Sequence, residues 1–85
     1  MPAPKSPITD ITAGPGGVMT DEVGVITGDL TLRTEYADGQ AVVHVQYKDA
    51  GEWYTVTGAR APVADPADIA AVHTVAAGIL NRPEG

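Results

Sequence analysis

The chain has 85 residues, no cysteine and a formal net charge of -6, from five basic and eleven acidic side chains. This length allows one small domain, and the missing cysteines exclude a disulfide framework and a thiolate metal site. The acidic excess argues against nucleic-acid binding, which depends on Lys and Arg that neutralise phosphates. No segment approaches the ~18 consecutive apolar residues of a membrane span, and the N-terminus lacks the apolar run of a signal peptide. We therefore expect a cytoplasmic protein without a membrane or nucleic-acid partner.

The beginning of the chain is rich in proline and glycine and shows little periodicity. We interpret residues 1–22 as a flexible tail and residues 23–85 as the folded domain. Residues 19–26 allow two interpretations. They extend the first strand with Gly28 as a bulge, or they form a short additional strand that turns at Gly28 and Asp29.

Asp38-Gly39 lies between two alternating apolar segments and predicts a β-hairpin, because a type I′ turn needs positive φ at both central residues. Pairing Ala37 with Gln40 sorts the side chains of the two strands onto an apolar and a polar face. On the apolar face, the expected pairs are Tyr36 with Ala41, Thr34 with Val43, Leu32 with Val45 and Leu30 with Tyr47. On the polar face, they are Glu35 with Val42, Arg33 with His44, Thr31 with Gln46 and Asp29 with Lys48.

The segment Asp49-Ala50-Gly51-Glu52 predicts a second turn, followed by a third strand that ends near Gly58. Pairing Lys48 with Trp53 around this four-residue loop places Tyr54 opposite Tyr47, Val56 opposite Val45 and Gly58 opposite Val43. The same face is then apolar on all three strands. Both turns therefore assign the same side of the sheet to the core.

The C-terminal segment has the pattern of a helix. Asp65 is a suitable N-cap, Pro66 fits the first helical position, and Asp68 complements the helix dipole. The helix is expected to end at Asn81, Arg82 and Pro83. Its apolar residues form one stripe at helical spacing: Ile69, Val72, Val75, Ala76, Ile79 and Leu80. The sequence thus predicts an α+β fold of order β-β-β-α, in which the helix covers the apolar face of a three-stranded antiparallel sheet.

No group of residues has the pattern of a catalytic, metal or cofactor site. His44 is predicted on the outer sheet face and His73 at the edge of the helical stripe, on opposite sides of the sheet. Ser6 lies in the tail, where no base partner is held. The glycine-rich residues 14–17 are not followed by the Lys of a phosphate-binding loop. We therefore predict no catalytic residue, no metal ligand and no cofactor.

Trp53 is predicted on the outer, polar face of the sheet. A large aromatic side chain in this position often anchors a binding partner. Alternatively, it packs over the stem of Lys48 in a cation–π contact, or the N-terminal segment covers it. The candidate partner-binding residues on this face are Trp53, Lys48, His44, Gln46, Thr55 and Arg33.

The helix carries no fully charged side chain between Asp68 and Arg82. A helix without a charged face is usually buried on both sides, although alanine is also simply a good helix former. About 60 ordered residues form a marginal core, and oligomerisation often compensates for this. We therefore expect a homodimer whose interface contains Ala70, Thr74, Ala77 and Gly78.

Three functional hypotheses follow. The first is a non-catalytic, self-associating module that binds another protein through the outer sheet face. The second is an acidic accessory or phage-encoded inhibitor or decoy of a basic target, which the net charge of -6 motivates. Separately, the Ala, Val and Gly bias with few Lys is typical of actinobacterial and phage proteins. The third is a small enzyme with His44 or His73 at a dimer interface.

Overall fold

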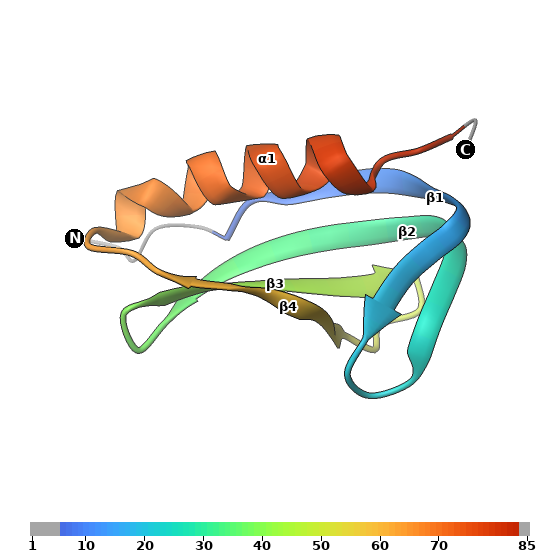
Figure 1. The fold of residues 1–85 in the computed structure, drawn as a ribbon, viewed down its shortest axis with the longest axis horizontal. Helices are drawn as coiled ribbons and strands as arrows, with labels where there is room; N and C mark the ends of the chain where they lie inside the picture. The colour runs from blue at the N-terminus through green and yellow to red at the C-terminus, as the bar shows by residue number, and fades with distance from the viewer. Residues whose placement is uncertain (1–5, 84–85) are drawn as a thin grey trace.

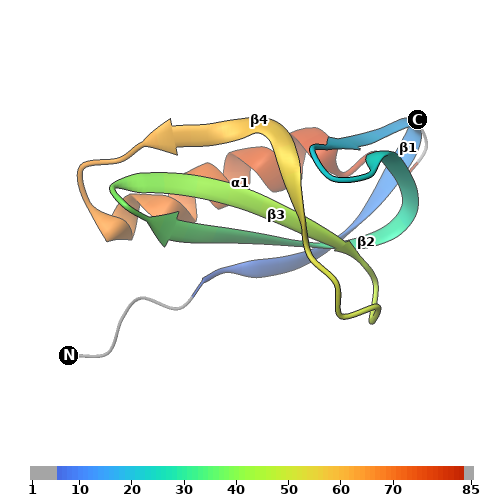
Figure 2. The same ribbon diagram turned by 90° about the horizontal axis from the view of Figure 1, so that it is seen from below.

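The computed structural model describes residues 6–83, which form an antiparallel sheet of four strands and one C-terminal helix (Figure 1). The elements are β1 (Ile8–Thr20), β2 (Gly24–Ala37), β3 (Gln40–Tyr47), β4 (Tyr54–Pro62), a 3₁₀ turn (Pro66–Asp68) and α1 (Ile69–Leu80). The strands are arranged in chain order and close into a small barrel. Figures 1 and 2 show α1 on one side of the sheet. The α+β class is confirmed, with an additional N-terminal strand.

The hairpin of β2 and β3 has the predicted register. Ala37 pairs with Gln40, and the alternation continues to the pair of Leu30 with Tyr47. Asp38 and Gly39 have φ angles of 51° and 77°, as a type I′ turn requires. The predicted apolar face forms much of the core, where Leu30, Leu32, Thr34, Val43 and Val45 are all at most 1 % exposed.

The register of β3 and β4 differs from the prediction. Tyr54 pairs with Val45 rather than with Tyr47, a shift of two residues that leaves every side chain on its predicted face. The shift arises because the chain turns one residue earlier than predicted, within a connection of residues 48–53 that has positive φ at Asp49 and Gly51. Farther along, an irregularity separates the pairs at Val42 and His44, so Gly58, at φ 76°, does not pair with Val43.

The expected flexible tail is the second correction, because most of residues 1–22 form strand β1. Ile11 and Ala13 pair with β2 and are buried, and Val18 returns to the same core after a break in register. The proline and glycine residues at 14–17 occupy that break, where Gly17 has a φ of 67°. They bend a strand here instead of marking a disordered segment. Residues 1–5 of the predicted tail lie outside the described residues.

The turn between β1 and β2 closes the barrel onto β4. Thr20 pairs with Val56, and the backbone N–H of Asp21 donates to the carbonyl of Thr55 at 3.0 Å. The Glu22 carboxylate accepts from the backbone N–H and the hydroxyl of Thr55, at 2.7 and 2.9 Å. The N–H of Thr55 lowers the pKa of Glu22, and the hydroxyl adds to this shift. Of residues 19–26, residues 24–26 extend β2 through Gly28 as the first interpretation predicts, whereas Met19 and Thr20 belong to β1 and residues 21–23 form the turn.

The helix begins and ends as expected, but its buried stripe is narrower. Asp65 Oδ1 accepts from the backbone N–H of Ala67 at 2.8 Å, which confirms the predicted N-cap. Two members of the predicted apolar stripe are largely exposed, Val75 at 61 % and Ile79 at 59 %. His73, expected at the edge of the stripe, is 5 % exposed. The helix is therefore rotated toward its histidine side relative to the sequence prediction.

Candidate docking groove

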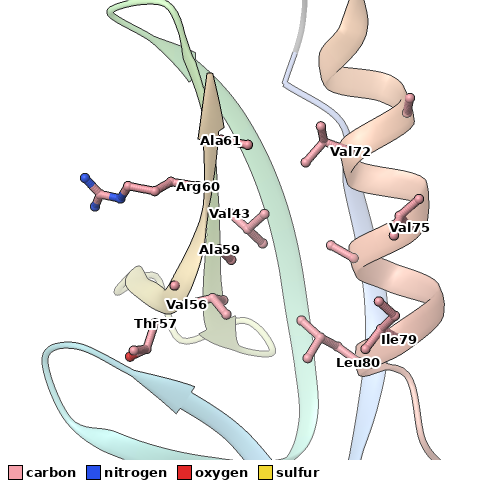
Figure 3. Close-up of a pocket in the computed structure, with 13 residues that line it drawn as sticks. Val43, Val56, Thr57, Ala59, Arg60, Ala61, Val72, Val75, Ile79 and Leu80 are labelled. Atoms are coloured by element: carbon pink, nitrogen blue, oxygen red, sulfur yellow. The ribbon is translucent and has the colours of Figure 1, made fainter. Parts of the chain in front are cut away.

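An apolar groove lies between α1 and β4 (Figure 3). It has a volume of about 600 Å³. Val43, Val56 and Ala59 project into it from the sheet, and Val72 and Leu80 project from the helix. Among residues 6–83, Arg60 is the only charged residue that lines it, and its side chain points away from the helix.

The groove exists because the helix and the barrel leave one edge of β4 uncovered. Among the described residues, β1 pairs with β4 only at Thr20 and Val56, so residues 57–62 keep a free edge. This segment carries small residues toward the helix, including Ala59 and Ala61. Short side chains on β4 leave a gap that larger ones fill in an ordinary core. The exposed lip of the groove on the helix side is formed by Val75 and Ile79.

The predicted dimer face lies next to this groove, on a neighbouring side of the helix. Ala70, Thr74 and Gly78 are exposed, and none of them lines the groove. Ala77 is partly buried and packs against the core, so it does not belong to a free surface. The exposed lip of the groove on the helix runs through Ala71, Val75 and Ile79. Sequence reasoning missed this lip because Val75 and Ile79 were assigned to the core.

The outer sheet face contains the predicted partner-binding residues, and most of them are already engaged with neighbours. The guanidinium of Arg33 lies 4.1 Å from the centre of the Trp53 ring, so the cation–π partner is Arg33 and not Lys48. Arg33 Nη2 also donates to Glu35 Oε1 at 3.1 Å. His44 Nδ1 lies 2.9 Å from the same oxygen, without hydrogen-bond geometry.

The remaining outer-face residues hold loops and neighbouring strands in place. Gln46 Oε1 accepts from the backbone N–H of Gly51 at 2.9 Å. The Lys48 ammonium lies 3.5 Å from Asp10 Oδ2, and the Thr55 hydroxyl donates to Glu22. These contacts give each side chain a role within the fold. The face is thus a polar network around a partly covered tryptophan, in which the buried Arg33 Nε and His44 Nδ1 find no hydrogen-bond partner among the described residues.

The two histidines have different surroundings on opposite faces of the sheet. His73 Nε2 lies 2.8 Å from Thr9 Oγ1, and its Nδ1 lies 2.8 Å from the buried Thr34 Oγ1. Burial lowers the pKa of His73, because the charged imidazolium is poorly solvated there. Within residues 6–83, no group of three or more potential ligands is arranged to hold a metal ion. Neither of the described helices combines the length and apolar character required to cross a membrane.

Comparison with known proteins adds no further assignment to the site. The chain matches no protein-family model, and no curated protein or solved structure shows a significant similarity to it. The functional argument therefore depends on the groove and its surroundings.

Proposed function

We propose that the chain is a non-catalytic protein-interaction module that receives the apolar face of a partner helix in the groove between α1 and β4. The groove itself is the observation that carries this proposal. It is lined almost entirely by aliphatic side chains and is open along the exposed side of α1. Helix-in-groove docking is a recurring mode of recognition for such surfaces.

The exposed aliphatic side chains supply the free energy for docking. Val75 and Ile79 are 61 % and 59 % exposed, although complete burial of such a side chain stabilises a protein by ~1.5–3 kcal/mol. Covering the remaining surface of both therefore contributes about 2–3 kcal/mol, before the walls of the groove are counted. A contiguous exposed apolar surface of this kind is typical of an interaction site.

Docking by side chains fits this groove better than addition of a strand to β4. The free edge of β4 contains Gly58 at φ 76°, which interrupts the regular strand, and ends at Pro62, which has no backbone N–H. Both features weaken an edge as a template for a further strand. A helix needs no backbone hydrogen bond from its partner, so these features do not oppose it.

The outer sheet face is a weaker site for a partner. Trp53 is partly buried under Arg33, and the side chains around it already contact one another. A partner there must break these contacts before it forms its own. We therefore assign the docking role to the groove.

Photo-crosslinking tests the proposal. The photoreactive residue p-benzoylphenylalanine replaces Val75 at the lip or, as a control, Ala70, which is exposed on the same helix but outside the groove. The full chain is irradiated in an extract of its host, and adducts are identified by mass. In parallel, the dye anilinonaphthalene sulfonate is titrated into dilute wild type, Val75→Glu and Ala70→Glu.

Adducts of protein mass from position 75 but not from position 70, together with dye binding that Val75→Glu abolishes, support the proposal. If every adduct has the mass of a small molecule, the groove holds an apolar metabolite, and this result contradicts a protein-interaction role. Equal adducts from both positions also contradict the proposal. Dye binding that is unaffected by Val75→Glu shows that the groove is not the apolar surface in use.

A further inference from the structure

The lip of the groove on α1 is complementary to itself. Ala71, Val75 and Ile79 are spaced by four residues and face the same side of the helix. Val75 is at the middle of the 12-residue helix, with the small Ala71 toward one end and the large Ile79 toward the other. An antiparallel copy of the helix, related by a two-fold axis at Val75, therefore places each Ile79 against the Ala71 of the other copy.

We infer that the helix received in the groove is α1 of a second copy of this chain. This inference rests on the proposed function, since it names the partner of the same groove. A two-fold contact uses the same surface on both copies, and here each copy provides both the projecting side chains and the cavity. The Val75 side chains of the two copies meet at the axis, and Ile79 of each copy reaches the groove of the other at Ala71.

The charges at the two ends of the helix match the same arrangement. Asp68 precedes Val75 by seven residues, Arg82 follows it by seven, and both are exposed. The two-fold axis places each Asp68 beside the Arg82 of the other copy, which forms two ion pairs at the rim. Asp68 makes no side-chain hydrogen bond to the helix N-terminus. Arg82 lies just beyond the helix end, where its Nε donates to the carbonyl of Ile79 at 3.1 Å, so its terminal guanidinium nitrogens are the groups that pair with Asp68.

The distribution of charge also permits two acidic chains to associate. The net charge is -6, but no Asp, Glu, Lys or Arg lies between Ile69 and Asn81, and the histidine of this segment, His73, is buried against the sheet. The helices therefore meet without bringing carboxylates together. A basic docking helix would find no opposite charge along this uncharged segment, whereas the equally uncharged α1 of a second copy needs none.

Sedimentation equilibrium of the full chain tests the inference. We expect a reversible monomer–dimer equilibrium for the wild type. Val75→Glu should raise the dimer dissociation constant at least about tenfold, because a buried carboxylate has no partner at the axis. Ala70→Glu makes the same change of charge on the same helix and should alter it less than about twofold. Far-ultraviolet circular dichroism and thermal unfolding verify that each variant is folded.

The ion pairs provide a second, independent measurement. Arg82→Asp and Asp68→Arg should each raise the dissociation constant by about twofold or more at low salt, and the double variant should recover much of the loss. A wild type that stays at 8.7 kDa up to about 1 mM overturns the second-copy inference. If position 75 still crosslinks a different protein, the module remains and only its partner is wrong. If both experiments fail, the groove has no docking role.

Discussion

The hydrogen bonds of His73 provide a quantitative test of how α1 is held on the sheet. His73 is the buried polar side chain of the helix, and its ring nitrogens lie 2.8 Å from the hydroxyls of Thr9 and Thr34. Thr34 is fully buried, whereas Thr9 is exposed. His73→Leu keeps a side chain of similar size but removes both hydrogen bonds.

The loss should be dominated by the buried hydroxyl. A net hydrogen bond contributes about 0.5–1.5 kcal/mol, and a buried polar group left without its partner costs about 1–3 kcal/mol. We expect His73→Leu to lower the free energy of unfolding by about 2–3 kcal/mol. Thr34→Val should cost a similar amount, because it leaves the imidazole Nδ1 unpaired in the core.

The double variant distinguishes this mechanism from a simple loss of packing. With both polar groups replaced by apolar ones, no buried group is left unpaired, so the combined cost should be about 1–2 kcal/mol less than the sum of the single costs. Urea unfolding at pH 7.5 and one fixed protein concentration measures the four free energies. Thr9→Val is the matched control, and it should cost less than about 1 kcal/mol because Thr9 is exposed. Additivity of the two core changes within about 0.5 kcal/mol would refute the coupling of His73 to Thr34.

Three further predictions concern pH, the bend in β1 and the outer face. Because burial lowers the pKa of His73 below its usual 6.5, the folded state binds this proton less readily than the unfolded chain does. The free energy of unfolding should therefore not depend on this group above about pH 6.5 and should fall by at most about 1.4 kcal/mol per pH unit below it. His73→Leu should show no such slope. Gly17→Ala should lower the free energy of unfolding by about 1–3 kcal/mol in thermal unfolding, since φ is 67° and the new Cβ lies 2.7 Å from the carbonyl oxygen of Ile26. Gly16→Ala places its Cβ in open space and should have almost no effect, and equal effects of the two changes would contradict the bend. Trp53→Ala should cost about 1–2 kcal/mol of stability and leave the sedimentation behaviour unchanged, and a variant that no longer associates would show that the outer face, not the groove, is the interface.

The parts of the fold that follow from local signals were predictable from sequence. Asp38-Gly39 determines a tight turn, and a tight turn determines the register of the strands on both sides of it. Asp65 and Pro66 similarly locate the start of the helical segment. The loop at residues 48–53 allows the chain to turn at more than one position, so the register after it was wrong by two residues although the faces were right.

Strand β1 could not be recognised because its pattern is interrupted. Ile11 and Ala13 alternate as in a half-buried strand, but residues 14–17 form an insertion before Val18 resumes the alternation. A period-two pattern that loses its phase over four residues resembles an irregular segment. The signal that could have revealed it is the match of the two short apolar stretches on either side of the glycines.

The groove and the partly covered tryptophan depend on tertiary packing, which periodicity does not describe. A helical stripe identifies apolar residues but not which neighbour covers each of them. The predicted apolar stripe contained residues that pack against the core beside His73 together with the exposed Val75. Residues about 100° apart on a helix can face different surroundings, and the periodicity does not separate them. The sequence predicted Arg33 and Trp53 on the same face, but the position of the Arg33 guanidinium over the Trp53 ring depends on the corrected register.

The location of the groove also explains why the small residues of β4 and the uncharged helix occur together. Larger side chains in place of Ala59 and Ala61 would fill the cavity and stabilise an isolated monomer. Charged side chains in place of Val75 and Ile79 would keep that monomer soluble. This chain does neither, and it retains an open apolar cavity beside two exposed aliphatic side chains. The proposed docking of a helix in the groove would compensate for this cavity, so Ala59→Leu should stabilise the monomer while it removes association.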